Sequence, residues 1–196
     1  TVTVTDDPAD NPFELTTGLV AHYPFDGNAS DMSGNGHHGT VNGATLATDR
    51  FGSAGKAFVF DGVDDHIRLA TLDGNKSNFG TADHTISAWI MTTNTSNTLL
   101  TIFNKGPHDT ESSRSKAFRI NSYGSNNGFI QYEDTFGTGG GNHVGSTPLR
   151  DGTWHHVLAS FRDVGDDLKL YVNGLLDYNQ TLPWVYDDIS HIVKIG

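Results

Sequence analysis

The fold is decided by residues 151–174, which read DGTWHHVLASFRDVGDDLKLYVNG. Residues 154–161 form an apolar run rich in aromatic side chains, with aspartate and glycine on both sides. Residues 168–172 then carry leucine or valine at every second position, which is the period of a β-strand with one buried face. The Asn-Gly dipeptide at 173–174 suits the left-handed conformations of a tight hairpin turn. The stretch therefore predicts two antiparallel strands, which continue into a third through residues 175–178.

The composition favours a single domain made of strands and turns. A chain of 196 residues corresponds to one domain with a short extension. Its 23 glycines and many strand-forming side chains favour an all-β chain. Helical periodicity persists nowhere beyond about two turns, and no apolar run approaches the roughly 20 residues of a membrane span. The absence of cysteine excludes disulfides and thiolate metal sites.

The charge of the chain limits its partners. The formal net charge is −11, from 12 basic and 23 acidic residues. A nucleic acid would be repelled by this excess of acid, so we expect no such partner. Many of the acidic side chains lie in loops rich in Asp, Asn and Gly, which suit a hard cation such as calcium. The alternative is that the acidic residues only keep the protein soluble.

Four further segments, together with the motifs DGTWHHVLASF and LKLYVNG, carry a resemblance to a known family. They are residues 18–44 (GLVAHYPFDGNASDMSGNGHHGTVNGA), 55–70 (GKAFVFDGVDDHIRLA), 84–92 (HTISAWIMT) and 99–106 (LLTIFNKG). In this order they resemble the laminin G-like, concanavalin A-like jelly rolls, a group that includes pentraxins and many bacterial sugar-binding modules. The resemblance covers residues 18–196 and implies an antiparallel two-sheet β-sandwich. It implies a function only weakly, because one sandwich supports many binding roles.

The two ends of the chain suggest how it is organised. Residues 1–5 alternate as TVTVT before a break at DDPADNP, so residues 1–17 are expected to be the exit strand and linker of a preceding repeat, or else a flexible tail. Residues 18–196 are expected to form the jelly roll. Domains of the family usually continue with further strands beyond the position of residues 194–196, so we expect either that this one lacks its final strands or that another segment completes the sheet. An unpaired edge strand of this kind invites association.

Within the sandwich we expect a first strand over residues 18–25 and core strands over residues 85–91 and 99–104. Trp89 is predicted to point inward as a large hydrophobic filler. Other expected strands cover residues 56–60, 66–69, 117–120 and 128–132.

The first candidate metal site is the loop that contains Asp26, Asn28 and Asp31. Carboxylate and amide oxygens at such spacing in a glycine-containing loop can surround one calcium ion, which takes 6 to 8 oxygen ligands. Asx turns explain the same residues without a metal. The resemblance favours calcium, because laminin G-like domains commonly hold this ion in loops at the rim of the sandwich.

The second candidate is the stretch Asp61-Gly62-Val63-Asp64-Asp65, which contains the adjacent carboxylates Asp64 and Asp65. Neighbouring carboxylates repel each other unless a cation or a proton lies between them. The resemblance to pentraxins implies calcium ligands at this place; the alternative is a solvated turn. Zinc is disfavoured, because each of the two adjacent histidine pairs would point to opposite faces of a strand.

The sequence argues against catalysis. Retaining glycoside hydrolysis needs two carboxyl groups about 5 Å apart. Only Glu14, Glu111 and Glu133 are glutamates, and a strand would place Glu133 and Asp134 on opposite faces. No Glu-x-Asp-x-x-Glu cluster and no Gly-x-Ser-x-Gly elbow is present. We therefore expect a protein that is not an enzyme.

Sugar binding would use aromatic rings that stack on a pyranose, with polar groups bonding its hydroxyls. The candidates are aromatic or imidazole side chains outside the core periodicity, namely Trp184, Tyr186, Phe136 and His143. The alternative for Trp184 is that it caps the end of the core.

Together these features predict a non-catalytic, calcium-assisted carbohydrate-binding or adhesion module of a secreted or surface protein. Calcium would order the rim loops, and the partner would be a glycan, a polysaccharide or a cell-surface protein. One alternative is an accessory or catalytic domain of a polysaccharide-degrading enzyme. Another is a structural spacer within an adhesin.

Overall fold

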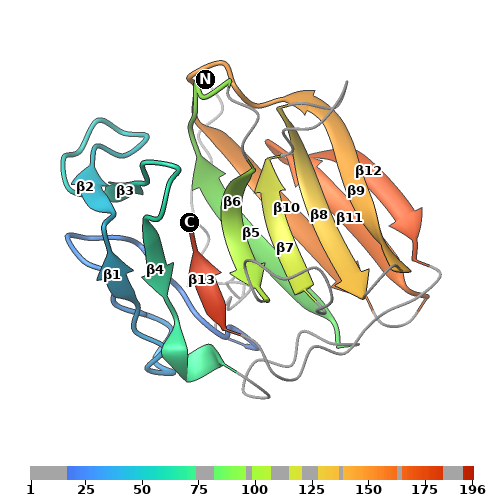
Figure 1. Cartoon of the computed structure of the whole chain (residues 1–196), viewed down its shortest axis with the longest axis horizontal. Helices are drawn as coiled ribbons and strands as arrows, with labels where there is room; N and C mark the ends of the chain where they lie inside the picture. Colours follow the sequence, from blue (N-terminus) through green and yellow to red (C-terminus); the bar gives the residue numbers. More distant parts are fainter. Residues whose placement is uncertain are drawn as a thin grey trace, which may run out of the picture.

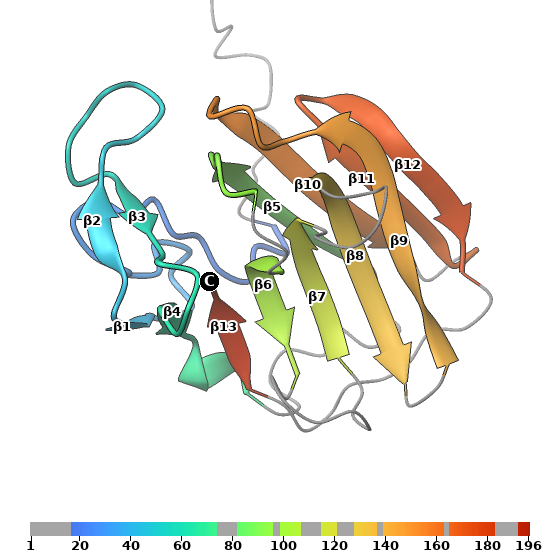
Figure 2. The ribbon, with the colours of Figure 1, turned by 45° about the horizontal axis from the view of Figure 1, so that its top comes forward.

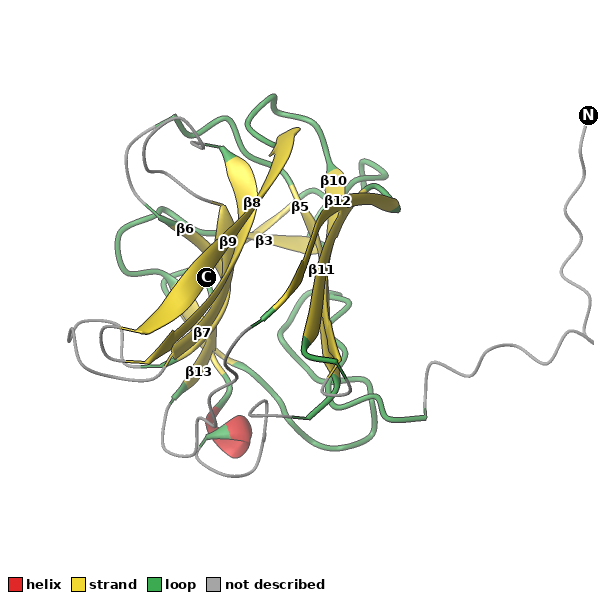
Figure 3. Cartoon of the chain, turned by 90° about the vertical axis from the view of Figure 1, so that its right-hand side faces the viewer, coloured by secondary structure: helices red, strands yellow, loops and turns green. Residues whose placement is uncertain are grey.

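The computed structural model describes residues 17–73, 82–95, 99–106, 115–120, 128–136, 139–162, 165–182 and 192–196. Within these residues the chain is an all-β sandwich, as predicted, and its only helical element is one short 3-10 turn, η1 (Ala70–Leu72). Figure 1 shows the larger sheet in front of the smaller one, and Figure 3 shows the two sheets facing each other across the core. The described residues contain no helix long and apolar enough to cross a membrane.

Two sheets make up the sandwich, and every strand pairing in them is antiparallel. The larger sheet has, in spatial order, β1 (Thr40–Asn42), β4 (His66–Arg68), β13 (Val193–Ile195), β6 (Leu100–Lys105), β7 (Ser115–Ile120), β8 (Phe129–Phe136) and β9 (Gly139–Pro148). The smaller sheet has β12 (Leu175–Thr181), β11 (Asp167–Val172), β10 (His155–Arg162) and β5 (His84–Ile90). A separate hairpin pairs β2 (Thr45–Ala47) with β3 (Ala57–Val59).

The predicted hairpin of residues 151–174 is confirmed as β10 and β11. Their register runs from Val157 opposite Val172 to Arg162 opposite Asp167. The turn between β11 and β12 has Asn173 at φ 51° and Gly174 at φ 80°, the left-handed conformations that an Asn-Gly turn supplies. The third predicted strand is also present, as β12.

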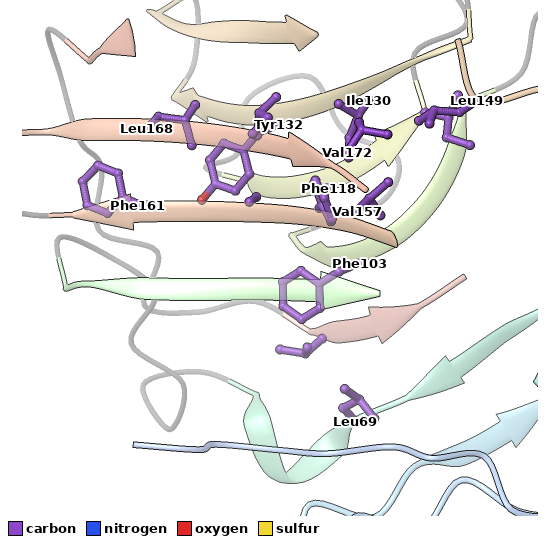
Figure 4. Packing of buried hydrophobic residues seen from close by; sticks show 14 of the residues in the cluster. Leu69, Phe103, Phe118, Ile130, Tyr132, Leu149, Val157, Phe161, Leu168 and Val172 are labelled. Carbon is purple, nitrogen blue, oxygen red and sulfur yellow. The ribbon is translucent and has the colours of Figure 1, made fainter. Parts of the chain in front are cut away.

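The core lies between the inner faces of the two sheets. Phe118, Ile130 and Tyr132 of the larger sheet are at most 1% exposed. They face Val157 and Leu168 of the smaller sheet, both fully buried, as Figure 4 shows. Each such side chain contributes roughly 1.5–3 kcal/mol by leaving water, so these layers supply most of the stability of the sandwich.

One edge of the sandwich is closed by contacts between β9 and β12. The carboxylate of Asp177 accepts hydrogen bonds from the backbone N–H groups of Ser146 and Thr147, at 3.0 and 3.1 Å, and from both hydroxyls. A Cβ atom on Gly145 would lie 1.9 Å from Asp177 Oδ2, so only glycine permits this approach. The two sheets are therefore tied together on this side.

The opposite edge is open, and two predictions fail there. Residues 18–25 form no strand, because Pro24 lacks a backbone donor and Phe25 adopts a left-handed φ of 58°. Trp89 points outward and is 45% exposed. The prediction was wrong because Ile86 and its alternate neighbours on β5 face the core, which leaves Trp89 on the other face.

Candidate functional site

A large cleft opens at this unclosed edge. It is lined by residues 17–26, by β3 and the loops on either side of it, and by β5, β6 and β13. It encloses about 2760 Å³, well above the roughly 300–1,000 Å³ of a pocket for one small molecule. Figure 2 shows the N-terminal strands, in blue and cyan, to one side of the other strands. Many of the exposed large hydrophobic side chains line this cleft, namely Val20, Phe51, Val59, Val63, Trp89 and Met91. A concentration of exposed apolar side chains of this kind is typical of a binding surface.

Aromatic rings form one wall of the cleft. Tyr23 and Phe25 stack with ring centroids 6.1 Å apart, and Phe25 meets Phe58 edge-to-face at 5.2 Å. The phenol of Tyr23 donates a hydrogen bond to the carbonyl of His37 at 2.5 Å. These contacts hold residues 18–25 against the core although they are not part of a sheet.

A cation–π cluster lies at the mouth of the cleft. The guanidinium carbon of Arg50 is 4.2 Å from the ring centroid of Phe51 and 4.3 Å from that of Trp89. The Trp89 ring in turn lies 5.2 Å from the ring of His156 on the neighbouring strand. Such contacts contribute about 0.5–1 kcal/mol at exposed sites, so they hold the loop between β2 and β3 against β5.

The outer face of the larger sheet carries a group of polar side chains, here called the polar row. Its members alternate with the core residues on β6, β7, β8 and β9, and they are Asn104, Arg119, Gln131, Glu133 and Asn142. Arg119 forms an ion pair with Glu133, and both line the cleft. Gln131 Nε2 donates to Asn142 Oδ1 at 2.7 Å. Gln131 is 2% exposed, and its Oε1 has no hydrogen-bond partner among the described residues.

The predicted metal loop is held together by hydrogen bonds within the protein. Asp31 is 5% exposed, and its carboxylate accepts the backbone N–H groups of His22, Ser33 and His37 at 2.8–2.9 Å. Burial raises the pKa of Asp31, but these three donors and the Ser33 hydroxyl outweigh it and lower the pKa well below its usual range. Asp31 is therefore ionised and already stabilised by the protein.

The other two residues of that loop also have protein partners. Asn28 Oδ1 accepts the backbone N–H of Ser30 at 2.8 Å, which is an Asx turn. Asp26 forms an exposed ion pair with Lys56 at 2.9 Å. The loop thus has the Asx turn and the protein contacts that were expected for the alternative without a metal.

At the second predicted metal site, the carboxylate of Asp61 lies beside those of Asp64 and Asp65. Asp61, Asp64 and Asp65 each offer an oxygen, and these oxygens lie within 4.8 Å of one another. Hydrogen bonds from backbone N–H groups, that of Val63 first, lower the pKa of Asp61. Three carboxylates on one short turn form a donor set of oxygens only, which fits calcium. The sequence placed Asp61 in the candidate stretch of residues 61–65, but only Asp64 and Asp65 were named as ligands there.

The predicted sugar-binding residues do not gather on a described surface. Trp184 and Tyr186 lie outside the described residues; Phe136 ends β8, and its side chain also lies outside them. His143 is 7% exposed, and its Nδ1 lies 3.1 Å from the hydroxyl of Tyr178 on β12. Burial lowers the pKa of His143, which serves as a contact between the sheets.

The adjacent carboxylates of β8 are divided between the two faces, as predicted. Glu133 lies in the polar row and pairs with Arg119. Asp134 lies on the inner face, where it accepts a hydrogen bond from Lys116 Nζ at 3.1 Å. These two carboxyl groups therefore cannot act on one glycosidic bond.

The described residues form a two-sheet antiparallel β-sandwich with a large cleft at one edge. The chain belongs to the concanavalin A-like lectin/glucanases superfamily, whose Laminin_G_3 model matches residues 61–192. No match was found among curated proteins.

Two solved structures show the similarity of the fold. Domain 4 of AbnA, a GH43 extracellular arabinanase from Geobacillus stearothermophilus solved with arabinotriose, is 24% identical, with a TM-score of 0.62 over 91% of this chain and 82% of that one. The CBM40 of the Ruminococcus gnavus IT-sialidase is 17% identical, with a TM-score of 0.50 over 67% of this chain and 77% of that one.

Proposed function

We propose that the chain is a non-catalytic, calcium-assisted carbohydrate-binding module of a secreted or surface protein. Membership of a superfamily of lectins and glucanases supports a role with carbohydrates. The similar domain of the arabinanase was solved with a trisaccharide, and the similar sialidase domain is a carbohydrate-binding module. Both are parts of larger enzymes, which supports a module that brings a protein to its glycan.

The observation that carries the proposal is the polar row beside the cleft. Sugar hydroxyls both donate and accept hydrogen bonds, and the row offers donors on Arg119 and Asn104 and acceptors on Glu133 and Asn142. A hydroxyl that donates to Gln131 Oε1 would also satisfy a buried acceptor, and leaving such an acceptor unsatisfied costs about 1–3 kcal/mol. Trp184, Tyr186 and Phe136 remain our candidates for stacking on the sugar ring.

Calcium has a supporting role in this proposal. Asp61, Asp64 and Asp65 would hold the ion, with the loop of Asp26, Asn28 and Asp31 as a second candidate. The ion would supply positive charge and open coordination positions at a turn whose carboxylates otherwise repel each other. Asp64 and Asp65 line the cleft, so the turn that carries them would hold the ion beside it.

A glycan array tests the proposal, run once in millimolar calcium and once in excess chelator, with arabinan oligosaccharides among the glycans. We expect binding that weakens about tenfold or more in Gln131→Leu, because one buried hydrogen bond to the sugar is lost. The matched control is Asn179→Leu, an exposed amide on β12. An array without signals, or equal binding by the two variants, contradicts the role of the polar row.

The calcium component has its own measurement. Calcium titrated into the chelator-treated protein should raise the thermal midpoint, and the Asp64→Asn variant should lose this response. If the midpoint does not respond in the parent protein, calcium is not a partner. Glycan binding could then still be tested separately.

The second candidate is an accessory domain of a polysaccharide-degrading enzyme, favoured by the similar domain of the arabinanase. Glycan turnover by the purified chain would show that the module is itself catalytic. Glu133→Gln should abolish such turnover if Glu133, held beside Arg119, were the reacting carboxylate.

A further inference from the structure

The charges of the polar row cancel. Its positive group, the guanidinium of Arg119, forms an ion pair with the carboxylate of Glu133. The other three members, Asn104, Gln131 and Asn142, are amides without charge. Figure 1 shows the strands that carry the row, β6 to β9, side by side in the larger sheet. A ligand along this row therefore meets neutral amides and one ion pair.

The ion pair of the row is within reach of a ligand but is largely shielded from water. Arg119 and Glu133 both line the cleft, and their side chains are only 14% and 15% exposed. Separating such a pair leaves two poorly solvated charges, which is strongly unfavourable. A ligand carboxylate would reach Arg119 only by displacing Glu133 or by lying beside it, and neighbouring carboxylates repel each other. The arrangement therefore disfavours an acidic ligand.

The side-chain amide of Gln131 gives a second reason that does not depend on the ion pair. Its Nε2 donates to Asn142 Oδ1 at 2.7 Å, and its Oε1 has no hydrogen-bond partner among the described residues. Gln131 is 2% exposed, so this acceptor depends on a ligand for a donor. A sugar hydroxyl can donate, whereas an ionised carboxylate or sulfate offers only acceptors. An acidic group at this place would leave the Oε1 of Gln131 unsatisfied.

The charge of the whole chain acts in the same direction. The formal net charge is −11, so a polyanionic polysaccharide is repelled before it reaches the row. Salt screens this long-range repulsion, but it screens a shielded ion pair much less. The selection by the row should therefore persist at physiological salt.

We propose that the polar row selects neutral glycans and rejects glycans that carry carboxylate or sulfate groups. This inference rests on the proposed function, because it names the class of carbohydrate that the module binds. Gln131 favours a hydroxyl by accepting its hydrogen bond. Glu133 determines specificity by rejection, because it occupies the guanidinium of Arg119 that would otherwise attract an acidic sugar.

A matched pair of ligands tests the selection on the unaltered protein. Arabinan, galactan and mixed-linkage β-glucan are neutral and carry primary hydroxyls, which oxidation converts to carboxylates on the same backbone. Binding is measured at one fixed calcium concentration, so that the acidic turn of residues 61–65 does not change its state. We expect at least one neutral polysaccharide to bind, and its oxidised form to bind about tenfold or more weakly. Polygalacturonate and chondroitin sulfate should not bind.

A variant of the row tests the role of Glu133. Glu133→Gln keeps the shape of the side chain and removes its charge, so Arg119 keeps a positive charge that no longer has this carboxylate beside it. The oxidised polysaccharide should bind to this variant about tenfold or more tightly than to the parent protein. The matched control is Asp167→Asn, which changes the net charge equally and removes the carboxylate of a partly exposed ion pair with Lys169 on the smaller sheet. This control should keep the parent's ratio of neutral to oxidised affinity.

The possible results separate this inference from the proposed function. Equal or tighter binding of an oxidised polysaccharide by the parent protein would overturn the selection and leave carbohydrate binding intact. If no polysaccharide binds, neutral or acidic, the proposed function fails and the inference fails with it. A folded Glu133→Gln variant with the parent's ratio, or an Asp167→Asn control with an altered ratio, would overturn the role of Glu133. Circular dichroism checks folding; if Glu133→Gln does not fold, the ligand pair on the parent protein decides.

Discussion

The imidazole of His84 should make the stability of the fold depend on pH in a defined window. His84 lies at the start of β5, where its Nε2 is 2.9 Å from the hydroxyl of Tyr132 and its ring is 5.3 Å from that of Phe161. Burial, assisted by the charge of Lys116, lowers the pKa of His84 from 6.5 to about 4, although the carbonyl of Ala82 opposes this shift.

The direction of the pKa shift of His84 decides whether the fold loses stability at low or at high pH. The unfolded chain takes up the proton first, so the neutral imidazole contributes its full stability above about pH 6.5 and loses it as the pH falls towards 4. A shift of roughly 2.5 pKa units, at about 1.4 kcal/mol each, corresponds to a loss of roughly 3 kcal/mol.

Urea unfolding at pH 7, 6, 5 and 4.5 measures this loss. His84→Gln removes the ionisable group, so the free energy of unfolding of this variant should fall less over the window than that of the parent. The control is the substitution of an exposed histidine, His22→Gln. Its free energy of unfolding should change with pH as steeply as that of the parent. If the free energy of unfolding of His84→Gln falls with pH as steeply as that of the parent, the burial of His84 is not the cause of the pH dependence.

Three further substitutions test the contact between β9 and β12 and the buried ion pair of Lys116 and Asp134. Asp177→Ala removes the acceptor of four hydrogen bonds between β9 and β12 and should cost roughly 2–6 kcal/mol of unfolding free energy in urea, at about 0.5–1.5 kcal/mol per bond. Gly145→Ala should destabilise the same edge without removing an acceptor, because its Cβ would meet Asp177 Oδ2 at 1.9 Å; unchanged stability would refute this close approach. Lys116→Met removes the Lys116 ammonium from its ion pair with the buried carboxylate of Asp134 and should cost about 3–5 kcal/mol of unfolding free energy. The added change Asp134→Leu should recover most of this loss, which a double-mutant cycle would measure.

The sequence predicted the parts of the fold whose signals are local. The hairpin of β10 and β11 follows from alternation and from one Asn-Gly turn, both contained in 24 consecutive residues of the sequence (151–174). The separation of Glu133 from Asp134 follows equally from the two-residue period of a strand. Trp89 was misplaced because size favours burial, whereas the alternation of its neighbours decides which face is buried.

The candidate site could not be predicted because it depends on register between strands. Arg119 meets Gln131, and Glu133 meets Asn142, only after β7, β8 and β9 are aligned. The bulge between Thr101 and Phe103 then shifts β6 relative to β7. A single residue of slip would exchange the polar row with the core face. No local pattern in the sequence specifies that alignment.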